Sequence, residues 1–140
     1  LASAIPNNYH KGTVPHSGTK KAEVGDLIMS VRAPAGEMGK TAYNAVIGRG
    51  VAAIKGNEFI FQSLVKMNFE GYWKRLSCGS TFESLNSDNI KNAEIMIPHL
   101  NEQKKIGAFF SNLDNLITLH QRKLEHLQDR KKACLEKMFV

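Results

Sequence analysis

Cysteine and long apolar runs are scarce in this sequence. Its two cysteines, Cys78 and Cys134, lie far apart and show no CxxC or Cys/His ligand spacing. This argues against a disulfide scaffold and a zinc site, so we expect no metal ion and no cofactor. No stretch of about 18 apolar residues and no charged-then-apolar leader is present. The pattern therefore predicts a cytoplasmic protein without a membrane segment.

The sequence also lacks the signatures of common enzymes. It contains no phosphate-binding loop and no GxGxxG, HExxH or GxSxG motif. The carboxylate and lysine of 129–131 resemble a fragment of a nuclease motif, but their helical context favours a solvated charged face. Cys78 has no histidine placed to activate it, and the scattered histidines are interpreted as surface residues: His10, His16, His99 and His126. We therefore expect no catalytic residue in the chain.

Cationic residues outnumber acidic ones. Nineteen Lys and Arg against 13 Asp and Glu give a formal net charge of +6 and a pI near 9.4. The excess is divided evenly, at +3 in residues 1–100 and +3 in residues 101–140. Such a balance favours a polyanionic partner, of which nucleic acid is the commonest.

The first hundred residues show the alternation of short apolar runs and turns that is typical of an α+β domain. Residues 1–23 are polar and without periodicity, so we expect an irregular segment there. Strands are predicted within 24–34, 41–47, 51–54 and 93–97, with a turn-forming loop at 35–40. Two helices are predicted around Phe59–Met67 and Phe69–Leu76 with Asn68 as an N-cap between them, and a single helical turn at 86–92. The expected fold is a small mixed β-sheet with short helices.

The last forty residues have the pattern of one long helix with an apolar edge. Apolar residues repeat at alternating spacings of three and four, interrupted only by His120 and Lys131, which we interpret as positions that set the register. Such a helix would be roughly 58 Å long, too long to bury its edge against one small domain. We therefore predict a coiled coil, with an ordinary terminal helix folded back on its domain as the alternative. The seam consists of Ile106, Phe110, Leu113, Ile117, Leu124, Leu127, Cys134 and Met138.

Cationic and hydroxyl residues recur at the glycine-rich turns of the first hundred residues. Flexible turns let backbone N–H groups and such side chains approach phosphate oxygens, and Arg can read base edges in a groove. Each residue taken singly is equally well explained as a solvated loop residue. The candidate DNA contacts are Lys20, Lys21, Arg32, Lys40, Thr41, Arg49, Ser80 and Thr81.

Five motifs, taken in order, resemble the DNA-sequence specificity subunits of type I restriction–modification systems. The segment 25–32, Gly-Asp-Leu-Ile-Met-Ser-Val-Arg, is similar to a strand motif of that family, and 36–40 follows it with Gly-x-x-Gly-Lys. Further along, 69–81 combines an aromatic helix with a Ser-Cys-Gly-Ser-Thr turn, and Leu85-Asn86 follows. Ile97-Pro98-x-Leu100-x-Glu102-Gln103 then matches the boundary before the family's long helix. The departures are Cys78, where the family usually has Ser, and His99, where it often has Pro.

The resemblance implies a DNA target recognition domain at 1–100, followed by a spacer and dimerisation helix at 101–140 that forms an antiparallel coiled coil. Because the chain begins with Leu1 rather than Met, we expect the recognition domain to lack its N-terminal part. By resemblance the protein would bind double-stranded DNA without catalysis and position the modification (methyltransferase) and restriction subunits on a split target site. Its helix would pair with a second copy in a homodimer or with another partner helix.

Two other functions stay open on the sequence alone. The chain could be a coiled-coil assembly or adaptor protein without DNA recognition, which would show no salt-sensitive affinity for DNA. It could also be a fragment of an enzyme such as a nuclease, which would cleave DNA in the presence of a metal ion.

Overall fold

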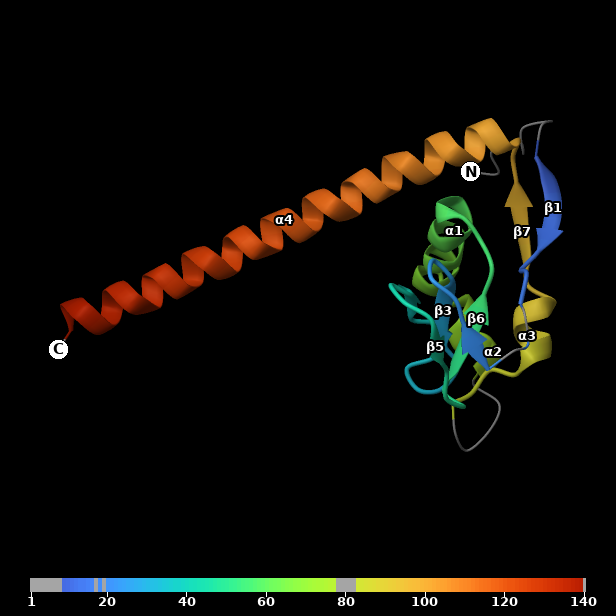
Figure 1. Cartoon of the computed structure of the whole chain (residues 1–140), viewed down its shortest axis with the longest axis horizontal. Coiled ribbons are helices and arrows are strands. Elements are labelled where there is room, and N and C mark those ends of the chain that lie inside the picture. The colour runs from blue at the N-terminus through green and yellow to red at the C-terminus, as the bar shows by residue number, and fades with distance from the viewer. Residues whose placement is uncertain (1–8, 17, 19, 78–82, 140) are drawn as a thin grey trace. The chain divides into compact units, whose positions relative to one another are not determined.

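The computed structural model describes residues 9–16, 18, 20–77 and 83–139 (Figure 1). The α+β class predicted from the sequence is confirmed, since short strands and short helices precede one long helix. Residues Leu1–Gly107 form one compact unit, and Ala108–Val140 form a second. In chain order the elements are β1 (His10–Thr13), β2 (Lys21–Ala22), β3 (Leu27–Ser30), β4 (Met38–Lys40), β5 (Ala45–Val46), β6 (Val51–Ile54), α1 (Glu58–Phe69), α2 (Tyr72–Ser77), α3 (Ser87–Lys91), β7 (Glu94–Ile97) and α4 (Leu100–Met138).

Over the described residues the strands form three small sheets, and every pair is antiparallel. The strand orders are β4-β3-β6, β2-β5 and β1-β7. The expected mixed pairing is therefore wrong. A parallel pair needs a crossover of a dozen or more residues, whereas β3 and β4 are joined by a short loop that returns the chain directly.

Two local predictions are corrected at the strands. The segment 1–23, expected to be irregular, contains β1 and β2. β1 pairs with β7 from the far end of the domain, with His10 opposite Ile97 and Thr13 opposite Glu94 (Figure 1). Residues 38–40, expected in a loop, form β4 against β3, whereas the strand expected at 41–47 is reduced to β5. Mostly exposed strands such as β1 carry no apolar alternation, so their sequence gives no strand signal.

The boundary between α1 and α2 also differs from the prediction. Asn57, rather than Asn68, caps a helix here: its side chain accepts a hydrogen bond from the Ile60 N–H at 3.0 Å. Asn68 lies inside α1, and Gly71, with φ of +74°, separates the two helices. The predicted helical turn at 86–92 is confirmed as α3, capped by Asn86.

The core of the domain lies between the β4-β3-β6 sheet and helices α1 and α2. Leu27 and Met29 of β3, Ile54 of β6 and Leu64 of α1 are almost completely buried. Trp73 of α2 is also fully buried, and its indole N–H donates to the Leu64 carbonyl at 3.4 Å. This core supports the surrounding loops, which carry the candidate DNA contacts named from the sequence.

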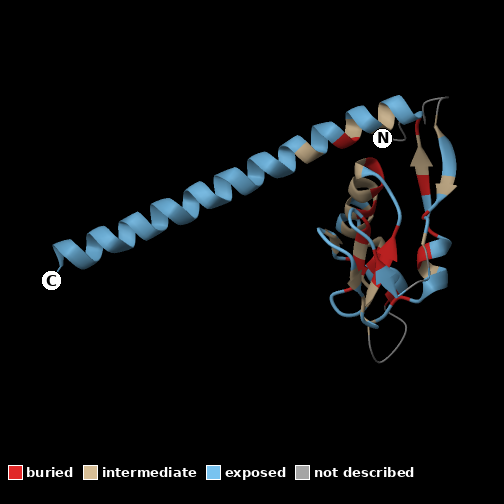
Figure 2. Cartoon of the chain, viewed as in Figure 1, coloured by how far each residue is buried: buried red, intermediate tan, exposed pale blue. Residues whose placement is uncertain are grey.

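The first two turns of α4 belong to the globular unit. Ile106 packs against the core, and Gln103 accepts a hydrogen bond from the Asn57 side chain at 2.9 Å. Gly107 is buried against the start of α1, where an added Cβ would lie 2.9 Å from the Glu58 Cβ. From residue 112 to its end at Met138 every α4 side chain is exposed (Figure 2).

Candidate nucleic-acid interface

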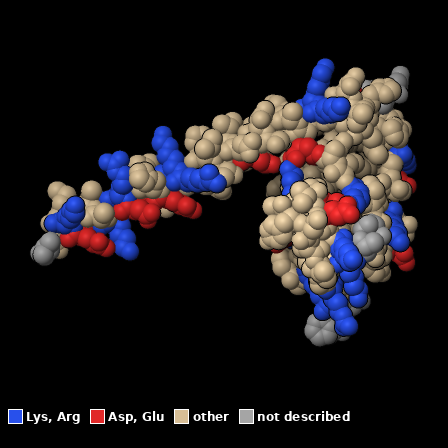
Figure 3. Space-filling view, viewed as in Figure 1, with Lys and Arg blue, Asp and Glu red and all other residues tan. Residues whose placement is uncertain are grey.

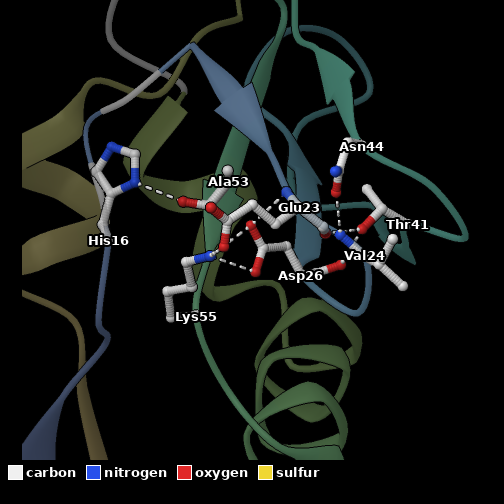
Figure 4. Close-up of polar contacts among 8 residues, drawn as sticks. All are labelled: His16, Glu23, Val24, Asp26, Thr41, Asn44, Ala53 and Lys55. Atoms are coloured by element: carbon white, nitrogen blue, oxygen red, sulfur yellow. Dashed lines mark hydrogen bonds and ion pairs between the residues drawn. The ribbon is translucent and has the colours of Figure 1, made fainter.

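The Gly25-Asp26 turn, part of the motif at 25–32, has a structural role. Gly25 has φ of +87°, a conformation that L side chains rarely adopt. The nearly buried Asp26 carboxylate accepts a hydrogen bond from the Glu23 N–H at 2.8 Å and pairs with Lys55 Nζ, also at 2.8 Å (Figure 4). The Glu23 hydrogen bond and the Lys55 ammonium hold the pKa of Asp26 below its ordinary value, although burial opposes them. The pKa of Lys55 is raised by Asp26 and then by Glu23.

Thr41 is hydrogen-bonded to the segment that contains this turn. Its hydroxyl donates to the Glu23 carbonyl at 2.5 Å, and its N–H donates to the Asp26 carbonyl at 2.9 Å. The Asn44 side chain accepts from the Val24 N–H at 2.9 Å (Figure 4). Thr41, a candidate DNA contact from the sequence, thus joins two loops of the domain.

His16 connects three segments of the chain. It forms a β-bridge with Ile54 of β6, and its Nδ1 lies 3.0 Å from the Ala53 carbonyl (Figure 4). Because a carbonyl only accepts, Nδ1 carries the proton in this contact. In the neutral ring, Nε2 is then the acceptor for the Ser87 hydroxyl, 3.4 Å away at the start of α3.

A hollow of about 350 Å³ opens beside His16. We call it the basic cleft and define it by its lining: His16, Gly18, Lys20, Val31, Ile47, Gly48, Arg49, Val51, Ala52, Leu85, Asn86, Ser87 and Ile90. The buried residues of this lining, Ala52, Leu85 and Ile90, are apolar, whereas Lys20 and Arg49 are exposed. No carboxylate is found among the described residues that line it. The Arg32 side chain lies next to Gly50, the residue between the cleft residues Arg49 and Val51, because a Cβ added to Gly50 would lie 3.9 Å from its Cδ.

The cations at this end of the domain are not neutralised by nearby acids. Lys20, Arg32 and Arg49 are exposed, and none has a side-chain hydrogen bond or ion pair within the described part of the chain. In the view of Figure 3, Lys and Arg side chains gather at the lower end of the globular unit. The arrangement suits an anion presented from outside.

The other candidate contacts lie elsewhere. Lys40 pairs with Glu58 and lies 4.4 Å from the centre of the Phe61 ring, so it is tied to the face of α1. Lys21 lies on a second hollow, beside Ala45 and Val46. Ser80 and Thr81 fall outside the described residues. The structure therefore brings Lys20 and Arg49 together at the cleft and places Arg32 beside Gly50, whereas Lys40 lies apart from them on Glu58.

Sequence reasoning missed three residues of the cleft. The sequence places His16 among the scattered histidines interpreted as surface residues. It places Asn86 and Ser87 at a predicted helical turn, with Asn86 also in the Leu85-Asn86 motif. The capping role of Asn86 is visible in the sequence, whereas the approach of His16 to Ser87 spans 71 residues and depends on tertiary pairing.

The seam residues of α4 divide between the two units. Ile106 lies in the globular unit and is partly buried there. The others are exposed, from 39% for Leu113 to 79% for Met138. Phe109 and Leu116, each one residue before a seam position, are 61% and 51% exposed and widen this apolar face.

The described residues include no helix long and apolar enough to cross a membrane. In the same residues, no group of three His, Cys, Asp or Glu side chains is placed to hold a metal ion.

The sequence is similar to specificity proteins of one class. The family model for the type I restriction modification DNA specificity domain matches residues 2–129. A protein of Methanocaldococcus jannaschii that carries the name type I restriction enzyme MjaX specificity subunit is 30% identical over 82% of this chain. The MjaIX specificity subunit of the same organism is 28% identical over 83%. Each match covers 28% of the relative, so the chain spans little more than a quarter of their length.

Solved structures share the fold. A chain from a study of complex assembly and conformational transition in the type I R-M system aligns with a TM-score of 0.66 at 20% identity, over 98% of this chain and 45% of that one. The HsdS subunit from Thermoanaerobacter tengcongensis gives 0.64 at 16% identity, over 87% and 41%. With the family match over residues 2–129, the conclusion is that this chain belongs to the family of type I restriction modification DNA specificity domains.

Proposed function

We propose that residues 1–100 act as a target recognition domain that binds double-stranded DNA through the basic cleft. The observation that carries this proposal is the convergence of Lys20 and Arg49 on one cleft whose described lining residues include no acid, with Arg32 beside the adjoining Gly50. In the cytoplasm the whole protein would be a non-catalytic specificity subunit that places modification and restriction subunits on a split DNA site.

The chemistry of the cleft fits two parts of a DNA duplex. Lys and Arg side chains without acidic partners are available to pair with DNA phosphates. Each such pair adds to the binding affinity, because it releases counterions from the DNA. Arg49 stands between two glycines on an exposed turn, which lets its planar fork of donors approach a guanine edge. Lys20 and Arg49 therefore have different roles in the proposal, as phosphate contact and base reader.

The exposed seam of residues 110–138 supports the second part of the proposal. Seven of its side chains face solvent, and an apolar stripe of this length is stabilised by packing on another helix. We propose that residues 101–140 form an antiparallel coiled coil, with a second copy in a homodimer or with a partner helix. This would hold two recognition domains apart on one DNA molecule.

The test is a salt titration. Binding of the 140-residue chain to a short random-sequence duplex is measured by fluorescence anisotropy between about 50 and 200 mM salt. Each phosphate neutralised contributes about −0.9 to the slope of log affinity against log salt. Lys20→Ala is expected to weaken binding to all sequences alike. It should also reduce the magnitude of the salt slope by about 0.9, the contribution of one phosphate contact.

The control is Lys66→Ala, which removes an exposed cation that already pairs with Glu70 on α1. It should leave the slope unchanged. A wild-type chain with no salt-sensitive affinity would refute the proposal and favour the adaptor function, for which the exposed seam alone is sufficient.

A further inference from the structure

The β2-β5 ribbon has one buried face and one exposed face. Its register places Ala22 opposite Ala45 and Lys21 opposite Val46. Ala22 is buried and Ala45 partly so, whereas Lys21 is exposed and Val46 is 80% exposed. Because side chains opposite each other in a ladder share a face, Lys21 and Val46 stand together on the outer side.

Further exposed apolar side chains adjoin this ribbon. Tyr43, just before β5, is 71% exposed, and Val24, just after β2, is 65% exposed. The hydrogen bond from the Val24 N–H to the Asn44 side chain holds the two flanking segments together. A single exposed apolar residue means little, but three around one two-stranded ribbon suggest a binding surface.

The ribbon is continuous with the basic cleft. The Ile47 N–H donates to the Lys20 carbonyl at 2.9 Å, and both residues line the cleft together with Arg49. Of the described residues that line the hollow beside the ribbon, Glu23 alone is acidic, and it pairs with Lys55 at 2.8 Å. The exposed apolar residues are thus bordered by cations whose charge is complementary to a polyanion.

We propose that the β2-β5 ribbon enters the major groove of DNA, where Tyr43 and Val46 contact the 5-methyl groups of thymine. Two strands lie about 5 Å apart, so a ribbon with its side chains fits a groove about 12 Å wide. Among the base edges in the major groove, the methyl group of thymine is the apolar one. Exposed aliphatic and aromatic side chains therefore recognise thymine through this methyl group. This inference rests on the proposed function and adds to it the element that reads the bases.

The test removes the methyl groups from the DNA. A duplex is enriched from a random pool on the wild-type chain and then synthesised with uracil in place of thymine. Loss of one contacted methyl should weaken wild-type binding about fourfold, the effect of exposing one methylene-sized group. Val46→Ser and Tyr43→Ser each remove a side chain that contacts a methyl group. In each variant, the difference in affinity between thymine and uracil should therefore disappear for the base that this side chain contacts.

The matched control is Leu100→Ser, which changes a side chain of 58% exposure at the start of α4. It should retain the full uracil effect, and circular dichroism should show all three variants folded. Equal wild-type affinity for the two duplexes, an undiminished uracil effect in both ribbon variants, or an enriched duplex without A·T pairs would overturn the inference. In each of these cases salt-sensitive binding persists, whereas failure of the proposed function would leave no duplex bound at all.

Discussion

At the scale of single residues, the Gly-Asp motif is explained by the loops that it joins. Asp26 is nearly buried, yet its carboxylate has both a backbone N–H and the Lys55 ammonium as partners. A buried charge without such partners would be strongly destabilising. The motif therefore holds β3 in place beside the turn at residue 41.

The first prediction concerns Asp26→Asn. The substitution keeps the shape but removes the charge, so we expect the free energy of unfolding at neutral pH to fall by about 1–3 kcal/mol. Since the pKa of Asp26 is lowered in the fold, its stabilising effect is present above the unfolded pKa and is lost as pH falls through the folded pKa. Urea unfolding should show the two proteins converging in stability below about pH 4.

Glu23→Gln serves as the control. The Glu23 side chain is 74% exposed, so its ion pair with Lys55 contributes less than about 1 kcal/mol. If Asp26→Asn changed stability no more than Glu23→Gln at neutral pH, the Asp26 carboxylate would have no special structural role.

At the scale of elements, the loop between β3 and β4 is fixed by its approach to α2. Gly36 has φ of +97°, and a Cβ added there would lie 2.8 Å from the Trp73 Cβ and 2.5 Å from the Asn68 side-chain oxygen. The second glycine motif at 36–40 thus marks a close contact between a loop and a buried tryptophan. A side chain at this position would separate the sheet from the helices.

The second prediction is that Gly36→Ala lowers the free energy of unfolding by about 2–4 kcal/mol. The left-handed conformation and the overpacking against Trp73 both contribute to this loss. Gly48→Ala is the matched control, because Gly48 has no positive φ and nothing lies within 4 Å of an added Cβ. Thermal denaturation of the two variants should differ clearly, and equal melting temperatures would contradict the assigned contact.

At the scale of the whole molecule, the exposed seam is the surface that the proposed coiled coil would cover. Phe110, Leu113, Ile117 and Leu124 are between 39% and 56% exposed in the single chain. Covering them in a helix pair would remove their apolar surface from water. Each Å² removed would favour association by a free energy of roughly 25 cal/mol.

The third prediction is that Leu124→Asp reduces the mass measured by light scattering. If the chain pairs with itself, the wild type has twice the 15.6 kDa of one chain, and the variant has that of one chain. Leu119→Asp is the control, because Leu119 is equally exposed at 59% but lies off the seam. Identical masses for wild type and Leu124→Asp would refute self-pairing and leave a partner helix as the proposed occupant.

Much of the fold could be predicted because its signals are local. The apolar run at 27–30, the capped turn at 86–92 and the heptad spacing of α4 each follow from residues close together in sequence. The motif order likewise identified the family. The candidate site was harder to predict, since a list of cations does not show which are neutralised: Lys40 pairs with Glu58, whereas Lys20 and Arg49 share a cleft.

By itself, the sequence determined the class of elements, the family and the apolar stripe of α4, because helical and strand periodicity act over a few residues. Only the tertiary structure decided the pairing of β1 with β7, the approach of His16 to Ser87 and the exposed ribbon beside the cleft. These contacts join residues 23 to 87 positions apart, and their free energy depends on closing loops around a common core rather than on local preference.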